Sequence, residues 1–190
     1  MEKFSKLEQT DLAKTSGDDV LYQNEYLTVL NYDGWSIIKE PKDCVIIIPI
    51  LIERNIIVLR NEYIPTYKYV DSQSHHLTVI AGQIEEGETA INAAIRELEE
   101  EAGLVLRSDY NVEIEKTLFV SKTQANKYHI IIMPLTEMDY DQKAATGDGS
   151  DSESKSNAVF VETKYINNLY ASDVITELMI YKAKEYLNMF

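Results

Sequence analysis

The sequence lacks the features that would tie it to a membrane or to an oxidising compartment. Cys44 is the one cysteine, so an internal disulfide is impossible and a reducing compartment suits the chain. The longest apolar run, Cys44 to Ile52, is too short to cross a bilayer, and Met1 to Asp19 is mostly polar, without the apolar core of a secretion signal. We therefore expect a cytoplasmic protein with no membrane partner, in which Cys44 is a small buried hydrophobe.

Positive charge is also scarce. The chain has 18 Lys and Arg against 32 Asp and Glu, which gives a net charge of -14. This balance argues against unspecific binding to nucleic acid or to an anionic membrane surface. It leaves room for one small anionic substrate whose phosphates are neutralised by metal ions. With 190 residues, 45% of them hydrophobic, and no internal repeat, the chain fits one globular domain with a small appendage.

The most informative stretch is Gly82 to Leu104, GQIEEGETAINAAIRELEEEAGL. From Thr89 onward it is rich in Ala, Leu and Glu, which predicts a helix. Gly103 follows the last apolar residue, where helices commonly end in a left-handed residue. At 100° per residue one face of this helix is apolar; it carries Ile91, Ala94, Ile95, Leu98 and Ala102.

Another face of this helix carries Glu97, Glu100 and Glu101. Like charges three or four residues apart each destabilise a helix by roughly 0.2–0.5 kcal/mol. Carboxylates near a helix C-terminus are also unfavourable, and Arg96 is the one arginine nearby. A solvated Glu-rich face is one interpretation. The other is a site for a hard divalent cation, Mg²⁺ or Mn²⁺, which prefers oxygen ligands and commonly acts on phosphates.

The spacing of the whole stretch decides between these interpretations. It resembles the signature of the Nudix hydrolases at every fixed position over 23 residues, a highly specific match. The resemblance implies a Nudix α/β/α sandwich around a mixed β-sheet, and cleavage of a nucleoside diphosphate linked to another moiety. The matched positions are Gly82, Glu88, Arg96-Glu97-Leu98, Glu100-Glu101 and Gly103-Leu104.

The resemblance also implies a role for each charged position of the motif. Glu97, Glu100 and Glu101 match the glutamates that bind the metal ions. Arg96 matches the residue that orients a motif glutamate through an ion pair. Glu88 matches a residue that supports or completes the metal site. These five residues are therefore the predicted catalytic and metal-binding set.

The glycines and neighbouring residues have predicted roles as well. Gly82 and Gly103 match glycines that allow tight turns, which suits the freedom of glycine at positive φ. We expect Ala81, Gly82 and Tyr63 to contact the substrate. A tyrosine beside the loop 66–74 could stack on a base, although such residues more often pack the loop itself.

The region before the motif predicts a small antiparallel unit. Residues 25–32 and 34–40 read as two strands joined at Asp33-Gly34, a favourable hairpin turn. This unit resembles the N-terminal part of ADP-ribose pyrophosphatases, where it builds a dimer interface and part of the substrate site. We therefore divide the chain into a tail and β unit over 1–40, a candidate dimerisation element, and a hydrolase domain over 41–190. A homodimer is expected.

The other strands and helices are predicted from the periodicity of apolar residues and from local composition. The apolar run 44–52 reads as a doubly buried strand in which Pro49 must lie at an edge or bulge. A helix over 172–189 has Ser172-Asp173 as its cap. Further strands are expected at 56–63, 77–81, 112–120, 129–135 and 158–162, with loops at 66–74 and 136–157.

The acidic loop 136–157 is either a mobile surface loop or a lid. The ADP-ribose group often carries a further catalytic carboxylate at this place. Asp148, Asp151 and Glu153 are the candidates, and Glu153 is chosen because it keeps the residue type and lies nearest the next strand. The proton acceptor in catalysis is then Glu101 or a carboxylate of this loop.

The resemblance leaves the substrate open. ADP-ribose or a nucleotide sugar is the first expectation, although Ile64 stands where that subgroup often has Arg, and Val120-Ser121-Lys122 lacks the proline that often marks it. The alternative enzyme is a housecleaning pyrophosphatase of nucleoside triphosphates, dinucleotides or capped RNA; the negative charge makes long RNA the least favoured. A non-enzymatic nucleotide-sensing module would be favoured by erosion of the motif glutamates, which are all present.

Overall fold

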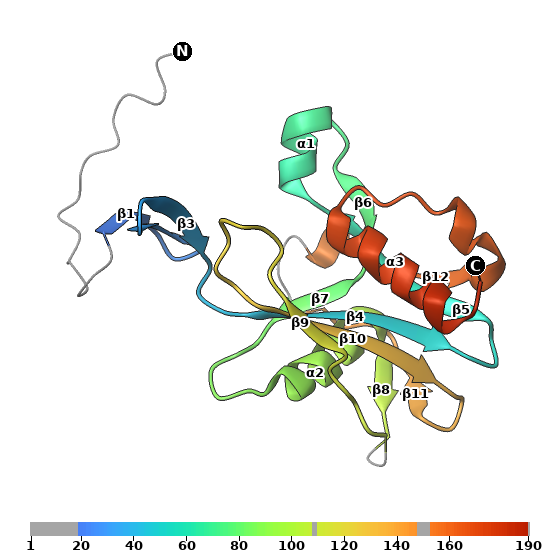
Figure 1. Cartoon of the computed structure of the whole chain (residues 1–190). Helices are drawn as coiled ribbons and strands as arrows, with labels where there is room; N and C mark the ends of the chain where they lie inside the picture. Colours follow the sequence, from blue (N-terminus) through green and yellow to red (C-terminus); the bar gives the residue numbers. More distant parts are fainter. Residues whose placement is uncertain (1–18, 108–109, 148–152, 190) are drawn as a thin grey trace. The chain divides into compact units, whose positions relative to one another are not determined.

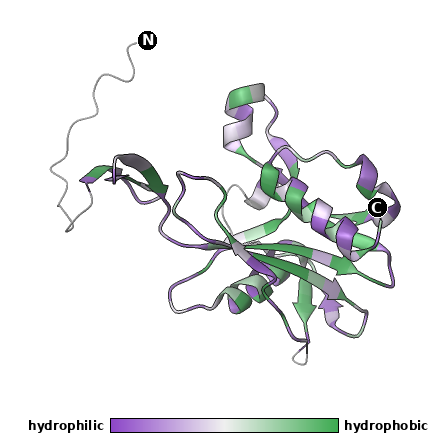
Figure 2. Ribbon diagram, in the orientation of Figure 1, coloured by the Kyte–Doolittle hydropathy of each residue, from purple (hydrophilic) through white to green (hydrophobic). Residues whose placement is uncertain are grey.

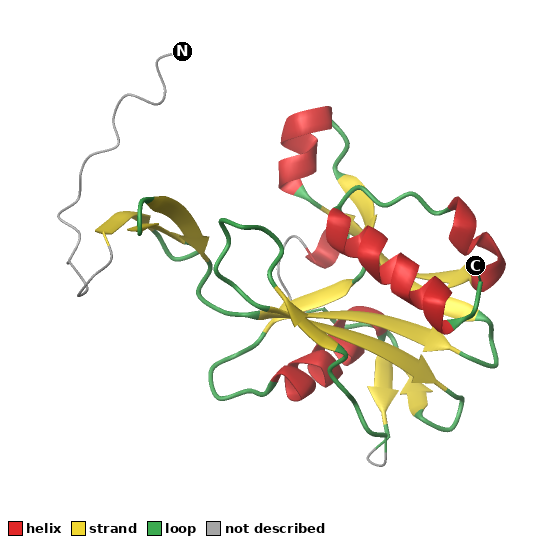
Figure 3. Ribbon diagram, viewed as in Figure 1, coloured by secondary structure: helices red, strands yellow, loops and turns green. Residues whose placement is uncertain are grey.

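The computed structural model describes residues 19–107, 110–147 and 153–189, and within them two compact units. The first unit contains the chain up to Asp43 together with Phe119–Lys127. The second contains Cys44–Leu118 and the chain from Tyr128 onward. Figure 3 shows the strands and helices of each. The described residues include no helix that is long and apolar enough to span a membrane.

The first unit is built on a three-stranded antiparallel sheet in the order β1-β2-β3 (Asp19–Gln23, Thr28–Tyr32 and Trp35–Lys39). Asp33 and Gly34 join β2 to β3 with φ of 49° and 79°. Two positive φ angles are what a two-residue hairpin of matching twist requires. The small N-terminal antiparallel unit is thus confirmed, and it has one strand, β1, more than expected.

Residues 119–127 belong to this first unit although they lie far along the chain. The Ile38 N–H donates to the Thr123 carbonyl at 2.7 Å, and the Ala125 N–H donates to the Ile38 carbonyl at 2.9 Å. The Asn126 side chain, 2% exposed, hydrogen-bonds the backbone at Glu40 and Lys42. Backbone pairing between segments 85 residues apart leaves no local pattern in the sequence.

The second unit is organised on a mixed seven-stranded sheet in the order β12-β5-β4-β10-β9, with β6 paired to β5 and β7 paired to β4. The β4–β10 pair is parallel and the other pairs are antiparallel. The strands are β4 Cys44–Leu51, β5 Ile56–Tyr63, β6 His75–Thr78, β7 Ile80–Gln83, β9 Lys116–Leu118, β10 Tyr128–Leu135 and β12 Asn157–Glu162.

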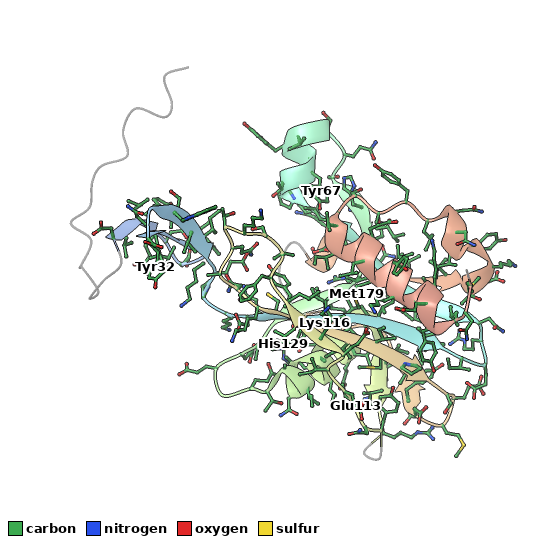
Figure 4. All side chains as sticks on the ribbon, in the orientation of Figure 1. Tyr32, Tyr67, Glu113, Lys116, His129 and Met179 are labelled. Carbon is green, nitrogen blue, oxygen red and sulfur yellow. The ribbon has the colours of Figure 1, made fainter. Side chains whose placement is uncertain are left out.

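Helices cover both faces of this sheet, which confirms the expected α/β sandwich (Figure 1). Helix α2 (Ala90–Ala102) packs into one apolar cluster and α3 (Val174–Tyr186) into the other. Every residue of β4 is buried, Cys44 included, because both of its faces are covered. Figure 2 shows the apolar character of this central strand, and Figure 4 marks Met179, the fully buried methionine of α3.

Pro49 is not at the edge of the sheet, because β4 is central. On one side, Pro49 stands opposite Met133 of β10. On the other side, pairing with β7 ends at Ile47, and pairing with β5 begins at Ile50. Proline has no N–H to donate to a neighbouring strand. Pro49 lies in the gap between the residues of β4 that pair with β7 and those that pair with β5.

Other segments differ from the sequence-based expectation in length or type. The loop expected at 66–74 contains a short helix, α1 (Pro65–Asp71), with proline at its first position and Tyr67 packed edge-on against His76 at 4.6 Å. The strand expected at 112–120 is limited to β9. Short segments not expected from the sequence are the paired strands β8 (Leu104–Leu106) and β11 (Tyr140–Gln142) and the 3₁₀ helices η1 (Glu153–Lys155) and η2 (Thr163–Asn168).

Candidate active site

Helix α2 is fixed at both ends by the residues that the sequence predicts for its termini. The Thr89 hydroxyl accepts a hydrogen bond from the Asn92 N–H at 3.2 Å. Gly103 ends the helix at φ 66°, and its N–H donates to the Glu99 carbonyl at 2.9 Å. The apolar face is anchored by Ala94, Leu98 and other buried residues. Because this face is held in the core, the orientation of the glutamate face is fixed as well.

Glu97 lies against Gly82 of β7. The glutamate is 8% exposed, and a Cβ added at Gly82 would overlap its carboxyl group. The expectation of a positive φ at Gly82 is wrong: the residue lies in a strand and is absent from the glycines of positive φ in the described chain. Glycine is needed here because the neighbouring carboxylate fills the space of a side chain, whereas Gly103 does have the left-handed backbone.

Arg96 links three of the predicted glutamates. Its Nε and Nη2 donate to the two carboxylate oxygens of Glu88 at 3.1 and 3.0 Å. Its Nη1 donates to Glu97 Oε1 at 2.6 Å and to Glu100 Oε2 at 3.1 Å. The hydrogen bond to Glu88 is the main cause that raises the pKa of Arg96; burial opposes it, and Glu97 and Glu100 reinforce it. The guanidinium therefore stays charged and holds these carboxylates in one network.

Glu101 is held by different partners. It is 5% exposed, and its Oε1 forms an ion pair with Nη1 of Arg60 on β5. Its Oε2 accepts a hydrogen bond from the Ala81 N–H at 3.2 Å. Ala81 thus contacts a motif glutamate through its backbone. Arg60 was not expected from the sequence, because it begins the polar half of the strand 56–63 and its burial is not visible there.

A cleft of about 360 Å³ opens beside Glu100 and Glu101. The segment 143–147 forms one wall, because the N–H groups of Thr146 and Gly147 donate to the Glu100 carbonyl at 3.1 and 2.9 Å. Carboxylates, an arginine and hydroxyl groups thus face one small space. The lining residues are Arg60, Glu100, Glu101, Ala145, Thr146, Gly147, Ser154, Ser156, Asn157 and Ala158.

The other predicted site residues are placed less directly. Tyr63 ends β5 and is not among the described residues that line the cleft. Its N–H donates to Ser156 Oγ at 3.0 Å, so it borders the cleft wall through the backbone. Glu153 begins η1, next to the lining residue Ser154, but its side chain lies outside the described part of the chain. Asp148 and Asp151 lie outside the described residues.

The donor set suits a hard divalent ion such as Mg²⁺ or Mn²⁺, because every candidate ligand atom is a carboxylate oxygen. Gly82 leaves the space that the Glu97 carboxyl group occupies. As the side chains stand, no three acidic, His or Cys side chains of the described residues form a cluster ready to hold a metal. The arginine network accounts for this, since Arg96 Nη1 lies between the oxygens of Glu97 and Glu100. The residues fit the ion in their chemistry.

Comparison with known proteins agrees with this geometry. The family model for the NUDIX domain matches residues 41–159, well over half of the chain. Among solved structures, the crystal structure of an ADP compounds hydrolase is similar with a TM-score of 0.64 and 20% identity, over 90% of this chain and 91% of that one. No curated protein matches the sequence. The chain belongs to the Nudix family, and it is an enzyme of the Nudix pyrophosphohydrolase class.

Proposed function

We propose that this enzyme hydrolyses the pyrophosphate bond of a nucleoside diphosphate linked to another moiety, ADP-ribose or a nucleotide sugar, with Mg²⁺ or Mn²⁺ as cofactor. One observation carries the proposal: Glu100 and Glu101 of α2 face a small polar cleft, while Glu97 is joined to Glu100 through Arg96. Carboxylates gathered beside a cleft of this size suit a metal-bound pyrophosphate. We place the reaction in the cytoplasm, since a chain with one cysteine suits a reducing compartment.

Glu97, Glu100 and Glu101 would hold the divalent ion. When bound, such an ion neutralises charge on the pyrophosphate and makes a coordinated water more acidic. Arg96 maintains the spacing of Glu97 and Glu100, and Glu88 holds Arg96 through two hydrogen bonds. Glu88 therefore supports the site through Arg96.

The proton of the attacking water needs an acceptor within hydrogen-bond reach. Both oxygens of Glu101 already have partners, Arg60 and the Ala81 N–H. A Glu101 that pairs with Arg60 and holds the ion is a weak base, because both cations favour its charged form, and this favours a carboxylate of the loop 136–157 as the acceptor. We assign the role to Glu153, because it directly precedes Ser154, which lines the cleft.

One observation favours ADP-ribose or a nucleotide sugar as substrate, namely the surroundings of Tyr63. The backbone of Tyr63 borders the cleft wall, and the centroid of its ring lies 5.0 Å from Lys155 Nζ and 6.0 Å from Lys68 Nζ. An aromatic face flanked by two ammonium groups suits a base or sugar that carries phosphate. We therefore assign substrate binding to Tyr63, and to Ala81 and Gly82 at the strand beside the glutamates.

We also propose that the β unit of residues 1–40 contributes to a homodimer. Large side chains of this unit are exposed: Tyr32 at 56% and Trp35 at 58% on the strands, and Tyr26 at 70% between β1 and β2. Exposed aromatic side chains gathered on one small unit are typical of an interaction surface. Light scattering tests the assembly, since a dimer doubles the 21.8 kDa mass of the chain. A monomer at micromolar concentration, with Trp35→Ser unchanged in mass, would contradict it.

A hydrolysis screen with Mg²⁺ and with Mn²⁺ tests the reaction. The substrates are ADP-ribose, nucleotide sugars, NADH, dinucleoside polyphosphates and nucleoside triphosphates, with products separated by ion exchange. AMP and ribose phosphate from ADP-ribose are the expected products. Release of pyrophosphate from a triphosphate, with no cleavage of ADP-ribose, would instead assign the enzyme to the housecleaning class.

A further inference from the structure

A buried arginine beside the motif carboxylates has no part in the roles given above. Arg60 lies on β5 and is 5% exposed. Residues two apart on a strand share a face. Ile56 and Val58, the preceding residues on the face of Arg60, pack into the apolar cluster under α2. The apolar face ends at Arg60, which is still buried, and burial of a charge is costly unless it is paired.

One partner of Arg60 is Glu101, which is 41 residues further along the chain. Arg60 Nη1 forms an ion pair with Glu101 Oε1, and the two side chains are 7% and 3% exposed. The second carboxylate oxygen accepts the Ala81 N–H at 3.2 Å. Arg60 comes from β5 and Ala81 from β7, so two strands hold one carboxylate of α2. Residues outside α2 therefore set the direction of the Glu101 carboxylate.

Arg60 and Glu101 both line the cleft, together with Glu100. We infer that Arg60 is a positioning residue, which holds the Glu101 carboxylate in the direction required for divalent-ion binding and turnover. The inference rests on the proposed function, because it takes Glu101 to be a ligand of the ion. Arg60 lies outside the motif, and the role of the motif residue Glu101 depends on it.

The chemistry of the side chain supports this role. A guanidinium is planar, carries a permanent charge and fixes the direction of a carboxylate better than a flexible ammonium does. Without Arg60, Glu101 would keep one hydrogen bond, from a backbone N–H. Its carboxylate could then rotate away from the cleft. Loss of a group that orients a metal ligand typically lowers metal affinity or activity by about 10–100-fold.

The test compares Arg60→Met and Arg60→Lys with wild type. Arg54→Met is the matched control, because Arg54 belongs to the same hairpin but is exposed and donates to Gln142. Mn²⁺ binding is followed by electron paramagnetic resonance without substrate, and kcat and KM are measured separately. Arg60→Met should weaken Mn²⁺ binding and lower kcat by about 10–100-fold, with little change in KM. Arg60→Lys should recover part of both losses, and Arg54→Met should match wild type.

A double-mutant cycle decides whether Arg60 acts through Glu101. In a Glu101→Gln background, Arg60→Met should change Mn²⁺ affinity and kcat by less than about 2-fold. An equal loss in both backgrounds would overturn the inference, as would wild-type Mn²⁺ affinity in Arg60→Met. If Arg60→Met fails to fold, Arg60→Lys replaces it in the cycle, and wild-type Mn²⁺ affinity and kcat in that variant would overturn the inference. If wild type hydrolyses none of the substrates, the proposed function fails, yet the Mn²⁺ comparison still tests the placement of Glu101 by Arg60.

Discussion

Gly82 and Glu97 share one space: the carboxyl group of Glu97 occupies the position that a Cβ on residue 82 would take. Glu97 belongs to α2 and Gly82 to β7, so the contact joins the motif helix to the sheet. It also keeps Glu97 buried, at 8% exposure, within reach of Arg96 Nη1 at 2.6 Å. Glu97 can therefore take this position only when residue 82 is glycine.

Gly82→Ala should disable the site more than it destabilises the fold. The added methyl group would displace the Glu97 carboxylate, because the strand backbone cannot move away without breaking its pairing with β4. We expect turnover to fall by about 10–100-fold, as for other losses of ligand geometry. Steady-state kinetics and thermal unfolding measure the two effects. Wild-type turnover in this variant would show that the Glu97 position is not critical.

Arg96→Lys should be damaging although the charge is conserved. One ammonium cannot reproduce the guanidinium bonds to Glu88, Glu97 and Glu100 at the same time. The expected loss in kcat is about 10–100-fold. Arg107→Lys is the control, since Arg107 pairs with Asp141 on the surface at 3.0 Å. Equal activity of the two variants would mean that the network around Arg96 does not organise the site.

Thr89→Ala should destabilise α2. The Thr89 hydroxyl accepts the Asn92 N–H at the start of the helix. Loss of such a cap typically costs about 1 kcal/mol. Urea unfolding of Thr89→Ala and Thr89→Ser measures it, and serine should retain most of the stability because it keeps the oxygen. An equal loss in both variants would point to the methyl group and not to the cap.

Stability at high pH should depend on Tyr110. Burial is the main cause that raises the pKa of Tyr110 to about 12, with a further contribution from Asp139, and its hydroxyl donates to the Pro134 carbonyl at 2.8 Å. The unfolded chain releases this proton near pH 10, at a tyrosine pKa of about 10. The folded state retains it to about pH 12, so the stability that it contributes is complete below pH 10 and is lost as the pH rises through this window.

Unfolding free energies of wild type and Tyr110→Phe between pH 9 and pH 12 test this account. Only the difference between the two proteins is informative, because the chain has 13 tyrosines. Wild type should lose stability relative to Tyr110→Phe as the pH rises. If the unfolding free energies of the two proteins change in parallel with pH, Tyr110 has the same pKa in the folded and the unfolded state.

Local signals in the sequence predicted the motif helix and the elements around it well. Thr89, Gly103 and Asp173 are capping residues whose effect is local, and α2, α3 and β5 follow from them and from residue periodicity. The pairing of Arg60 with Glu101 and the assignment of 119–127 to the first unit depend on contacts between distant segments. Such contacts leave little trace in the sequence, because β5 turns polar from Arg60 through Glu62 and nothing in this run singles out Arg60. Short elements such as α1, β8 and β11 have too few residues to show a period.

Hydrolysis of ADP-ribose by wild type and Glu100→Gln, each with Mg²⁺ and with excess chelator, tests the central claim most directly. The Glu100 side chain is 29% exposed, so the substitution should not unfold the protein. The account predicts AMP and ribose phosphate from wild type with Mg²⁺. It predicts a loss of orders of magnitude in Glu100→Gln and in both chelated samples. Equal turnover by the two proteins, or turnover that persists in the chelator, would contradict a metal site built on the carboxylates of α2.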